Sequence, residues 1–134
     1  MLLADAAQAV DGKLYVLGGG WSIAGPGAVS MAIALKLEVP WDRTNERHHW
    51  RLDLVDGDGH PVLVQTGDGP APLNVAGELE VGRPVGVAPG TPIDVPMAIN
   101  LPPLPLPPGR RLVWRLTIDG EAREDWQLAF TTRP

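Results

Sequence analysis

The segment RLVWRLTID, Arg111 to Asp119, has an apolar side chain at every second position and, Val113 apart, a polar side chain between them. Successive side chains of a β-strand point to opposite faces, so this alternation predicts a strand with one buried and one solvated face. Leu112, Trp114 and Leu116 fall on the apolar face, and Arg111 and Arg115 fall on the opposite one. We therefore expect Trp114 to lie in the core of the protein.

The residues after this segment predict its partner strand. Asp119-Gly120 is a turn dipeptide typical of tight β-hairpins. In the following stretch, EAREDWQLAF, the side chains of Trp126, Leu128 and Phe130 share one side. These two segments are the clearest hairpin that the sequence predicts.

The same alternation recurs between clusters of glycine and proline along the chain. MAIALKLEV, Met31 to Val39, alternates strictly and predicts a half-buried strand, and HWRLDLV, residues 49–55, repeats the pattern. No segment of ten or more residues holds apolar side chains at helical spacing without a glycine or proline inside it. Further strands are expected at residues 60–65, 74–81 and 91–100, and at 1–10 and 13–21, the last two joined by Asp11-Gly12.

Short strands without helices predict the fold class. We expect an all-β protein with about eight or nine short strands, and a two-sheet antiparallel β-sandwich buries one face of each strand. The length of 134 residues predicts a single domain over residues 1–134.

Composition and charge argue against several functions. The net charge of −5 works against binding to phosphate backbones, so nucleic acid is not an expected partner. The chain has no cysteine, which excludes disulfides and thiolate metal sites. MLLADAAQAV has no basic residue typical of a signal peptide, and no apolar run reaches about 18 residues, the length of a membrane span. We expect a cytoplasmic protein without a membrane partner or a cofactor.

Three stretches resemble a family of small bacterial single-domain proteins of unknown function. They are ADAAQAVDGKLYVLGGGW, HWRLDLVDGDGHPV and LPLPPGRRLVWRLTIDGE; they are distributed between residues 4 and 121, so the resemblance spans most of the chain. The resemblance implies a compact immunoglobulin-like or C2-like sandwich and carries over no catalytic or binding residue. The closing stretch also resembles the last hairpin of many immunoglobulin-like modules.

The stretch LPLPPGR, Leu104 to Arg110, has the letters of a proline-rich docking ligand, in which Pro105, Pro108 and Arg110 would contact a partner. Proline cannot donate to a β-ladder, so these prolines belong on a sheet edge or outside the sheet, while the leucines between them pack inward. We favour this structural interpretation over a docking peptide, because strands enclose the stretch on both sides.

Asp56, Asp58 and His60 form the densest group of possible metal ligands. Asp56-Gly57-Asp58-Gly59 resembles the start of a calcium loop, but the twelfth position counted from Asp56 is Gly67 where an EF-hand needs glutamate. A hairpin turn whose aspartates accept local backbone hydrogen bonds explains the same residues, and we favour it.

Two of the five tryptophans lie outside the alternating segments. Trp21 follows three glycines and Trp41 follows Val39-Pro40. Each is either an exposed anchor of an interface, where tryptophan is enriched, or a plug at one end of the sandwich. The sequence leaves both alternatives open.

No arrangement of residues predicts catalysis. Ser22 and Ser30 are the two serines, and neither has the Gly-x-Ser-x-Gly context of a nucleophile. We expect a non-enzymatic protein that interacts with an unknown protein partner or with itself. The alternative is a module that binds a small ligand or calcium through its end loops.

Overall fold

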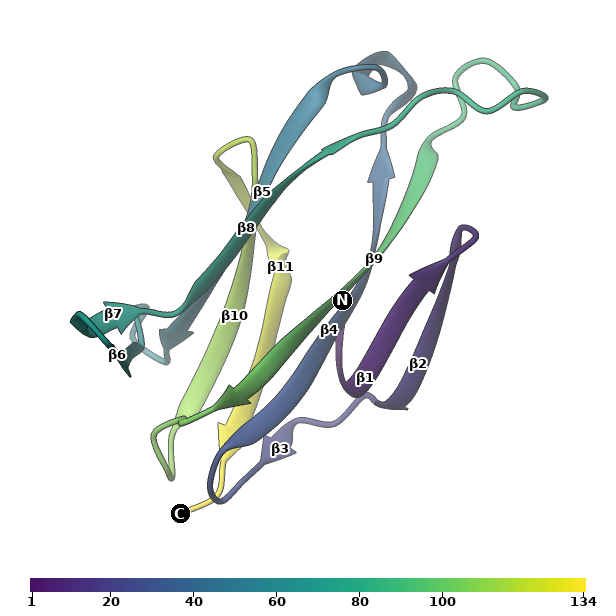
Figure 1. Cartoon of the computed structure of the whole chain (residues 1–134). Helices are drawn as coiled ribbons and strands as arrows, with labels where there is room; N and C mark the ends of the chain where they lie inside the picture. The colour runs from purple at the N-terminus through teal and green to yellow at the C-terminus, as the bar shows by residue number, and fades with distance from the viewer.

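The computed structural model describes residues 1–134 and contains eleven strands and one short 3-10 helix (Figure 1). All strands but β3 pair in antiparallel fashion, and β3 pairs in parallel with the last strand. The elements are β1 (Leu2–Val10), β2 (Lys13–Gly19), β3 (Ile23–Ala24), β4 (Val29–Val39), the 3-10 helix η1 (Trp41–Arg43), β5 (Arg47–Asp56), β6 (Leu63–Thr66), β7 (Gly69–Pro72), β8 (Asn74–Glu80), β9 (Ile93–Leu104), β10 (Arg111–Ile118) and β11 (Glu121–Thr132).

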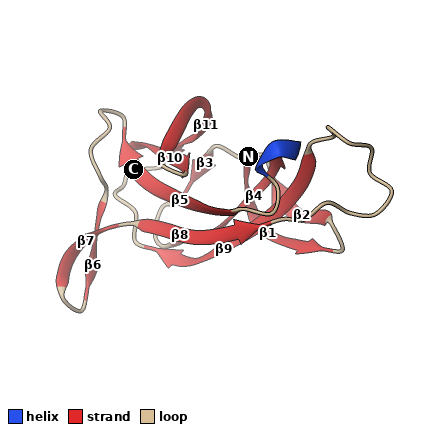
Figure 2. Cartoon of the chain, turned by 90° about the horizontal axis from the view of Figure 1, so that it is seen from above, coloured by secondary structure: helices blue, strands red, loops and turns tan.

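Two sheets enclose the main core and confirm the predicted all-β sandwich. The first has the strand order β2-β1-β4-β9, and the second has the order β3-β11-β10-β5-β8 (Figures 1 and 2). Their inner faces bury apolar side chains against each other, among them Met31 and Ile33 of β4 and Leu52 and Leu54 of β5. No helix in the structure has the length and apolar character needed to span a membrane.

The predicted hairpin of β10 and β11 lies at the centre of the second sheet. Trp114 is fully buried, and its neighbours across the two flanking strands are Leu54 and Leu128. Trp126 and Trp50, also expected in the core, are half-buried and pack at its margin. Both lie toward the Asp119-Gly120 end of the sheet, so they cover the edge of the core rather than fill it.

The first half of β4 is buried on both faces, which corrects the expectation of a half-buried strand there, whereas Lys36 and Glu38 in its second half are exposed as expected. All five residues from Met31 to Leu35 are at most 2% exposed. Met31, Ile33 and Leu35 face the main core, whereas Ala32 and Ala34 point to the outer face and belong to a separate alanine cluster with Ala4 and Ala7. The alternating pattern does not predict that the outer face is buried, because alanine, although apolar, is small enough to be expected at a solvent-exposed position of a strand.

The β1–β2 hairpin covers that outer face. β1 pairs with β4 only through Leu2, Leu3 and Ala4, and beyond Asp5 it lies over β4 and against β9 (Figure 1). The bend needs glycine at position 18, where φ is +60° and a Cβ would collide with the Asp5 carboxylate. Small alanine side chains allow the close approach of the bent hairpin to the sheet.

Asn100 on β9 fastens the hairpin to the sheet. Its Oδ1 accepts a hydrogen bond from the Ala7 amide at 3.2 Å, and its Nδ2 donates to the Ala7 carbonyl at 2.9 Å. The side-chain amide therefore replaces a neighbouring strand for one residue of β1.

Replacing Asn100 with alanine is expected to loosen the hairpin. Loss of two hydrogen bonds lowers the free energy of unfolding by about 1–2 kcal/mol. Hydrogen exchange of the Ala7 amide, measured by NMR, should become faster because its acceptor is gone. Asp94→Ala on the same strand removes only an exposed ion pair with Lys36 and is the control. Unchanged exchange at Ala7 in Asn100→Ala would contradict this account of the hairpin.

The structure has more strands than the eight or nine expected. β3 is only two residues long, and β6 and β7 form a separate small hairpin after the Asp56–Gly59 turn. β7 reads GPAP, which strand propensity does not favour. Its pairing depends on the Thr66–Gly69 turn, where the Thr66 hydroxyl donates to the Gly69 carbonyl at 2.7 Å.

Candidate functional site

The proline-rich stretch leads from β9, at the edge of the first sheet, to β10, at the centre of the second. β9 is an edge strand and ends at Leu104, and the chain is non-strand from Pro105 to Arg110. Leu104 and Leu106 are buried in the core, and the Thr132 hydroxyl donates to the Pro107 carbonyl at 2.6 Å. Pro105, Pro108 and Arg110 are exposed, but a partner that took this stretch as a free ligand would have to pull both leucines out of the core.

Asp56, Asp58 and His60 come together in the turn after β5. One possible ligand atom from each lies within 4.8 Å of the others. Asp56 Oδ1 accepts hydrogen bonds from the amides of Asp58 and His60, at 2.9 and 3.0 Å. The bond from the His60 amide, with the one from Asp58, holds the pKa of Asp56 below its ordinary value. This carboxylate closes the turn, as the hairpin interpretation requires.

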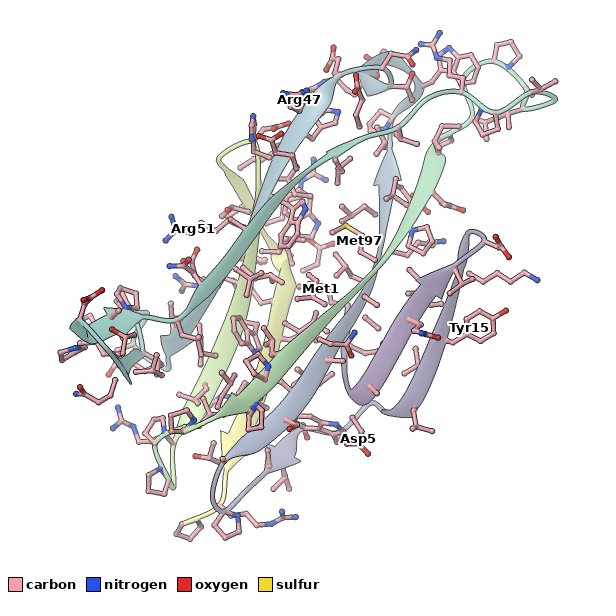
Figure 3. All side chains as sticks on the ribbon, in the orientation of Figure 1. Met1, Asp5, Tyr15, Arg47, Arg51 and Met97 are labelled. Atoms are coloured by element: carbon pink, nitrogen blue, oxygen red, sulfur yellow. The ribbon has the colours of Figure 1, made fainter.

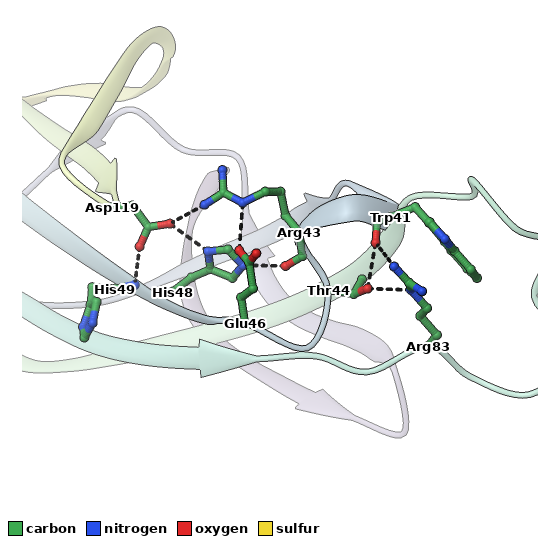
Figure 4. Close-up of polar contacts among 8 residues, drawn as sticks. All are labelled: Trp41, Arg43, Thr44, Glu46, His48, His49, Arg83 and Asp119. Carbon is green, nitrogen blue, oxygen red and sulfur yellow. Dashed lines mark hydrogen bonds and ion pairs between the residues drawn. The ribbon is translucent and has the colours of Figure 1, made fainter.

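Trp21 and Trp41 have different surroundings. Trp21 is half-buried, packs against the main core and meets the Phe130 ring edge-on with 6.2 Å between centroids. Trp41 begins η1, and the Arg83 guanidinium stacks 4.2 Å from its ring centroid while also donating to the Trp41 carbonyl (Figure 4). Trp21 thus serves as a plug, and one face of Trp41 is already covered by Arg83.

A cavity of about 430 Å3 opens at the end of the sandwich where β4, β5 and the β10–β11 turn meet. We call it the end cavity. Apolar and charged side chains alternate around it, and its charged residues are Lys36, Glu38, Arg43, His48, Asp119, Glu121 and Arg123. The basic groups have acidic neighbours: Lys36 lies 3.8 Å from Glu38, and Arg123 lies 3.2 Å from Glu121.

His48 is the most buried polar group of the end cavity, at 6% exposure. Its Nδ1 lies 2.7 Å from Asp119 Oδ2, and its Nε2 lies 2.8 Å from the Arg43 carbonyl (Figure 4). Both neighbours are hydrogen-bond acceptors, so the doubly protonated, cationic form of the ring is the one that satisfies both contacts. The hydrogen bond to Asp119, with that to Arg43, raises the pKa of His48 above its ordinary value.

Asp119 connects this histidine to the hairpin turn. Its Oδ1 accepts the amide of His49 at 2.9 Å, and its φ of +51° places it in the left-handed region that aspartate tolerates. The hydrogen bond from His48, with that from the His49 amide, lowers the pKa of Asp119. Because neither nitrogen of His48 is free to take a proton, this histidine–aspartate pair is arranged as a structural clasp and not as a general base.

The sequence analysis did not predict this clasp. His48 and Asp119 are 71 positions apart, His48 on β5 and Asp119 in the turn between β10 and β11. The Asp-Gly turn was recognised from its residues, but its side-chain partner depends on β5 lying beside β10. Sequence spacing alone carries no signal for such a pair.

The free edge of β2 is the most apolar exposed strand of the protein. β2 is the outermost strand of the first sheet, and Tyr15, Val16 and Leu17 are exposed by 55%, 41% and 70%. The Tyr15 side chain points away from the body of the molecule (Figure 3). A shallow hollow of about 570 Å3 lies along the hairpin beside these three residues. We call this backbone edge, with its three side chains, the β2 edge.

A comparison with protein families matches residues 1–131 to a family of unknown function, DUF6941. The chain belongs to the DUF6941 family. The match covers nearly all of the sandwich, and it confirms the resemblance to a family of unknown function. Comparisons with curated proteins and with solved structures gave no match.

In this DUF6941 chain the sequence pattern predicts β2 as a strand but does not predict that its outer edge is exposed. The stretch LYVLGG was recognised as strand-forming, and its hairpin with β1 is confirmed. Its exposure follows from the bend at Asp5 and Gly18, which turns the hairpin away from the main core. The only sequence signal is the run Leu14 to Leu17, which is apolar without alternation.

Proposed function

We propose that this DUF6941 chain is a non-enzymatic protein-interaction module and that its binding surface is the β2 edge. One observation carries the proposal: a seven-residue strand with four consecutive apolar side chains, Leu14 to Leu17, lies at the end of a sheet with one side unpaired. Such an edge is a template for a further strand, because its free N–H and C=O groups give affinity and its side chains give specificity.

The other sheet edges support the choice of β2, since each has a feature that discourages pairing. β9 contains Pro96, Pro102 and Pro103, β8 carries Glu78 and Glu80, and β3 is two residues long. In the small third sheet, β6 is four residues long and β7 contains Pro70 and Pro72. Prolines, charges and short length are the usual protections of edge strands. β2 has a single charge, Lys13, at its first residue, and no proline.

The end cavity supports the non-enzymatic part of the proposal. Its most buried titratable group, His48, has both nitrogens bonded within the protein. The small-ligand or calcium alternative ranks below the β2 edge because the Asp56 carboxylate already closes its own turn.

A library of phage-displayed seven-residue peptides tests the proposal directly. Panning uses the purified chain and, in parallel, a Val16→Pro variant, in which proline removes one N–H of the edge and its ring obstructs an added strand. We expect peptides of alternating apolar pattern that bind the wild type and a Val16→Thr control, which keeps the N–H, and that lose at least about tenfold in affinity for Val16→Pro. Recovery of no peptide, or only of peptides indifferent to Val16→Pro, would overturn the proposal.

A further inference from the structure

The β2 edge has a structure suited to one particular occupant. Resting on the proposed function, we propose that this occupant is the β2 edge of a second copy of the chain, paired antiparallel about a two-fold axis at Val16. The resulting homodimer continues the first sheet of one copy into that of the other. Its pairing is isologous, since the same residues are used on both sides.

Hydrogen-bonded and non-hydrogen-bonded residue pairs alternate along the β1–β2 hairpin. This alternation determines which backbone N–H and C=O groups of β2 point away from β1. Asp11 and Gly12 have φ of 51° and 73°, as in a two-residue type I′ turn, which pairs Val10 with Lys13 through hydrogen bonds. Hydrogen-bonded pairs alternate along an antiparallel ladder, so Gln8–Tyr15 and Ala6–Leu17 are also bonded pairs.

Asn100 gives the same phase independently. It occupies both the N–H and the C=O of Ala7, so those groups point away from β2 and the pair Ala7–Val16 is not hydrogen-bonded. The N–H and C=O groups of Val16, and by alternation those of Leu14, therefore point away from β1. They are the free donors and acceptors of the β2 edge.

A two-fold axis at Val16 gives the free N–H and C=O groups of β2 hydrogen-bond partners on the second copy. Val16 lies opposite Val16 of the second copy, and each N–H reaches the opposite C=O. Tyr15 then lies opposite Leu17 of the second copy, which joins the two most exposed apolar side chains of the strand. Aromatic and aliphatic cross-strand pairs of this kind stabilise antiparallel sheets.

Charge complementarity favours a second copy as the occupant. The same register places Lys13 opposite Gly19 of the second copy, next to Gly18, against which the Asp5 carboxylate lies. Lys13 and Asp5 have no ion-pair partner within the chain; the eleven pairs of the structure involve other residues. The Asp5 carboxylate fills the space beside Gly18 that a side chain would occupy, so in this register two symmetric Lys13–Asp5 pairs flank the apolar centre.

Sedimentation equilibrium of the full chain over a range of concentrations tests the dimer. We expect the 14.3 kDa chain to reach twice its mass on concentration and the Val16→Thr control to behave alike. Val16→Pro should weaken the dimer at least about tenfold, because it removes the central hydrogen bonds. Circular dichroism and a thermal melt verify that both variants are folded; proline at this position breaks no bond to β1.

A charge reversal tests the register separately. Lys13→Glu and Asp5→Lys each place like charges together and should weaken the dimer, whereas the double variant restores opposite charges and should recover most of the affinity. Recovery in the double variant is not expected if the two residues act only within one copy. Failure of the double variant to bind better than either single variant would overturn the register.

The possible outcomes separate this inference from the proposed function. A wild type that stays monomeric, or a dimer that Val16→Pro leaves intact, overturns the homodimer. If peptides from the library still bind the β2 edge in that case, the interaction module stands with a different protein as its partner. If neither dimer nor peptide depends on Val16, both proposals fail.

Discussion

Replacing Trp114 with alanine is expected to lower the free energy of unfolding by about 3–5 kcal/mol. Trp114 is fully buried at the centre of the second sheet and is one of the largest side chains in the main core. Its removal leaves a cavity that flanking strands cannot close, because β5 and β11 are fixed by pairing on both sides of β10. Urea denaturation at constant pH measures the loss.

Two variants control this prediction. Trp114→Phe keeps most of the apolar volume and removes an indole N–H that is buried without a hydrogen-bond partner, so its loss should be much smaller. Val113→Ala changes the next side chain, which is half-buried and points to the opposite face. A loss below about 1 kcal/mol for Trp114→Ala would mean that Trp114 is not at the centre of the core.

Replacing His48 with alanine is expected to lower the free energy of unfolding at pH 6 by about 2–4 kcal/mol. The variant leaves the Arg43 carbonyl without its donor and the Asp119 carboxylate without its nearest cation. His49→Ala is the matched control, because its side chain is exposed and contacts only the exposed Glu78, at 3.3 Å. Equal losses for the two variants would contradict the clasp.

The same variant should change the pH dependence of stability. The pKa of His48 is raised on folding, so its contribution is complete below the ordinary value of 6.5 and disappears as the pH rises through the folded pKa. The pKa of Asp119 is lowered, so its contribution is complete above 3.8 and disappears as the pH falls through the folded pKa. The stability difference between wild type and His48→Ala is therefore largest between these two values. A difference that grows above pH 7 would contradict this account.

The strands were predictable where one side of each faces water. In β5 and β10, alternation separates Leu52, Leu54, Leu112 and Trp114 from the charged side chains between them, and the structure confirms both strands. The prolines that follow Asn100 likewise predicted a sheet edge, because a residue without an N–H cannot donate to a neighbouring strand. Local chemistry suffices in these cases, since the pattern and the exposed face belong to the same few residues.

The His48–Asp119 clasp and the β2 edge both depend on contacts between distant segments of the chain. The clasp needs β5 beside β10 to bring His48 to Asp119, and the β2 edge needs Asn100 and the outer alanines of β4 to fasten the hairpin. Neither interaction is expressed in sequence spacing, because the partners lie tens of residues apart.

The sequence by itself determined the all-β class, the strands with one solvated face and the turns at Asp11-Gly12 and Asp119-Gly120, because these follow from side-chain periodicity and local backbone preference. Tertiary structure alone decided that Met31 to Leu35 of β4 are buried on both sides, that both ring nitrogens of His48 have partners within the protein and that β2 is left open. Each of these depends on which strands become neighbours, and that choice is made by packing the whole core rather than by any one segment.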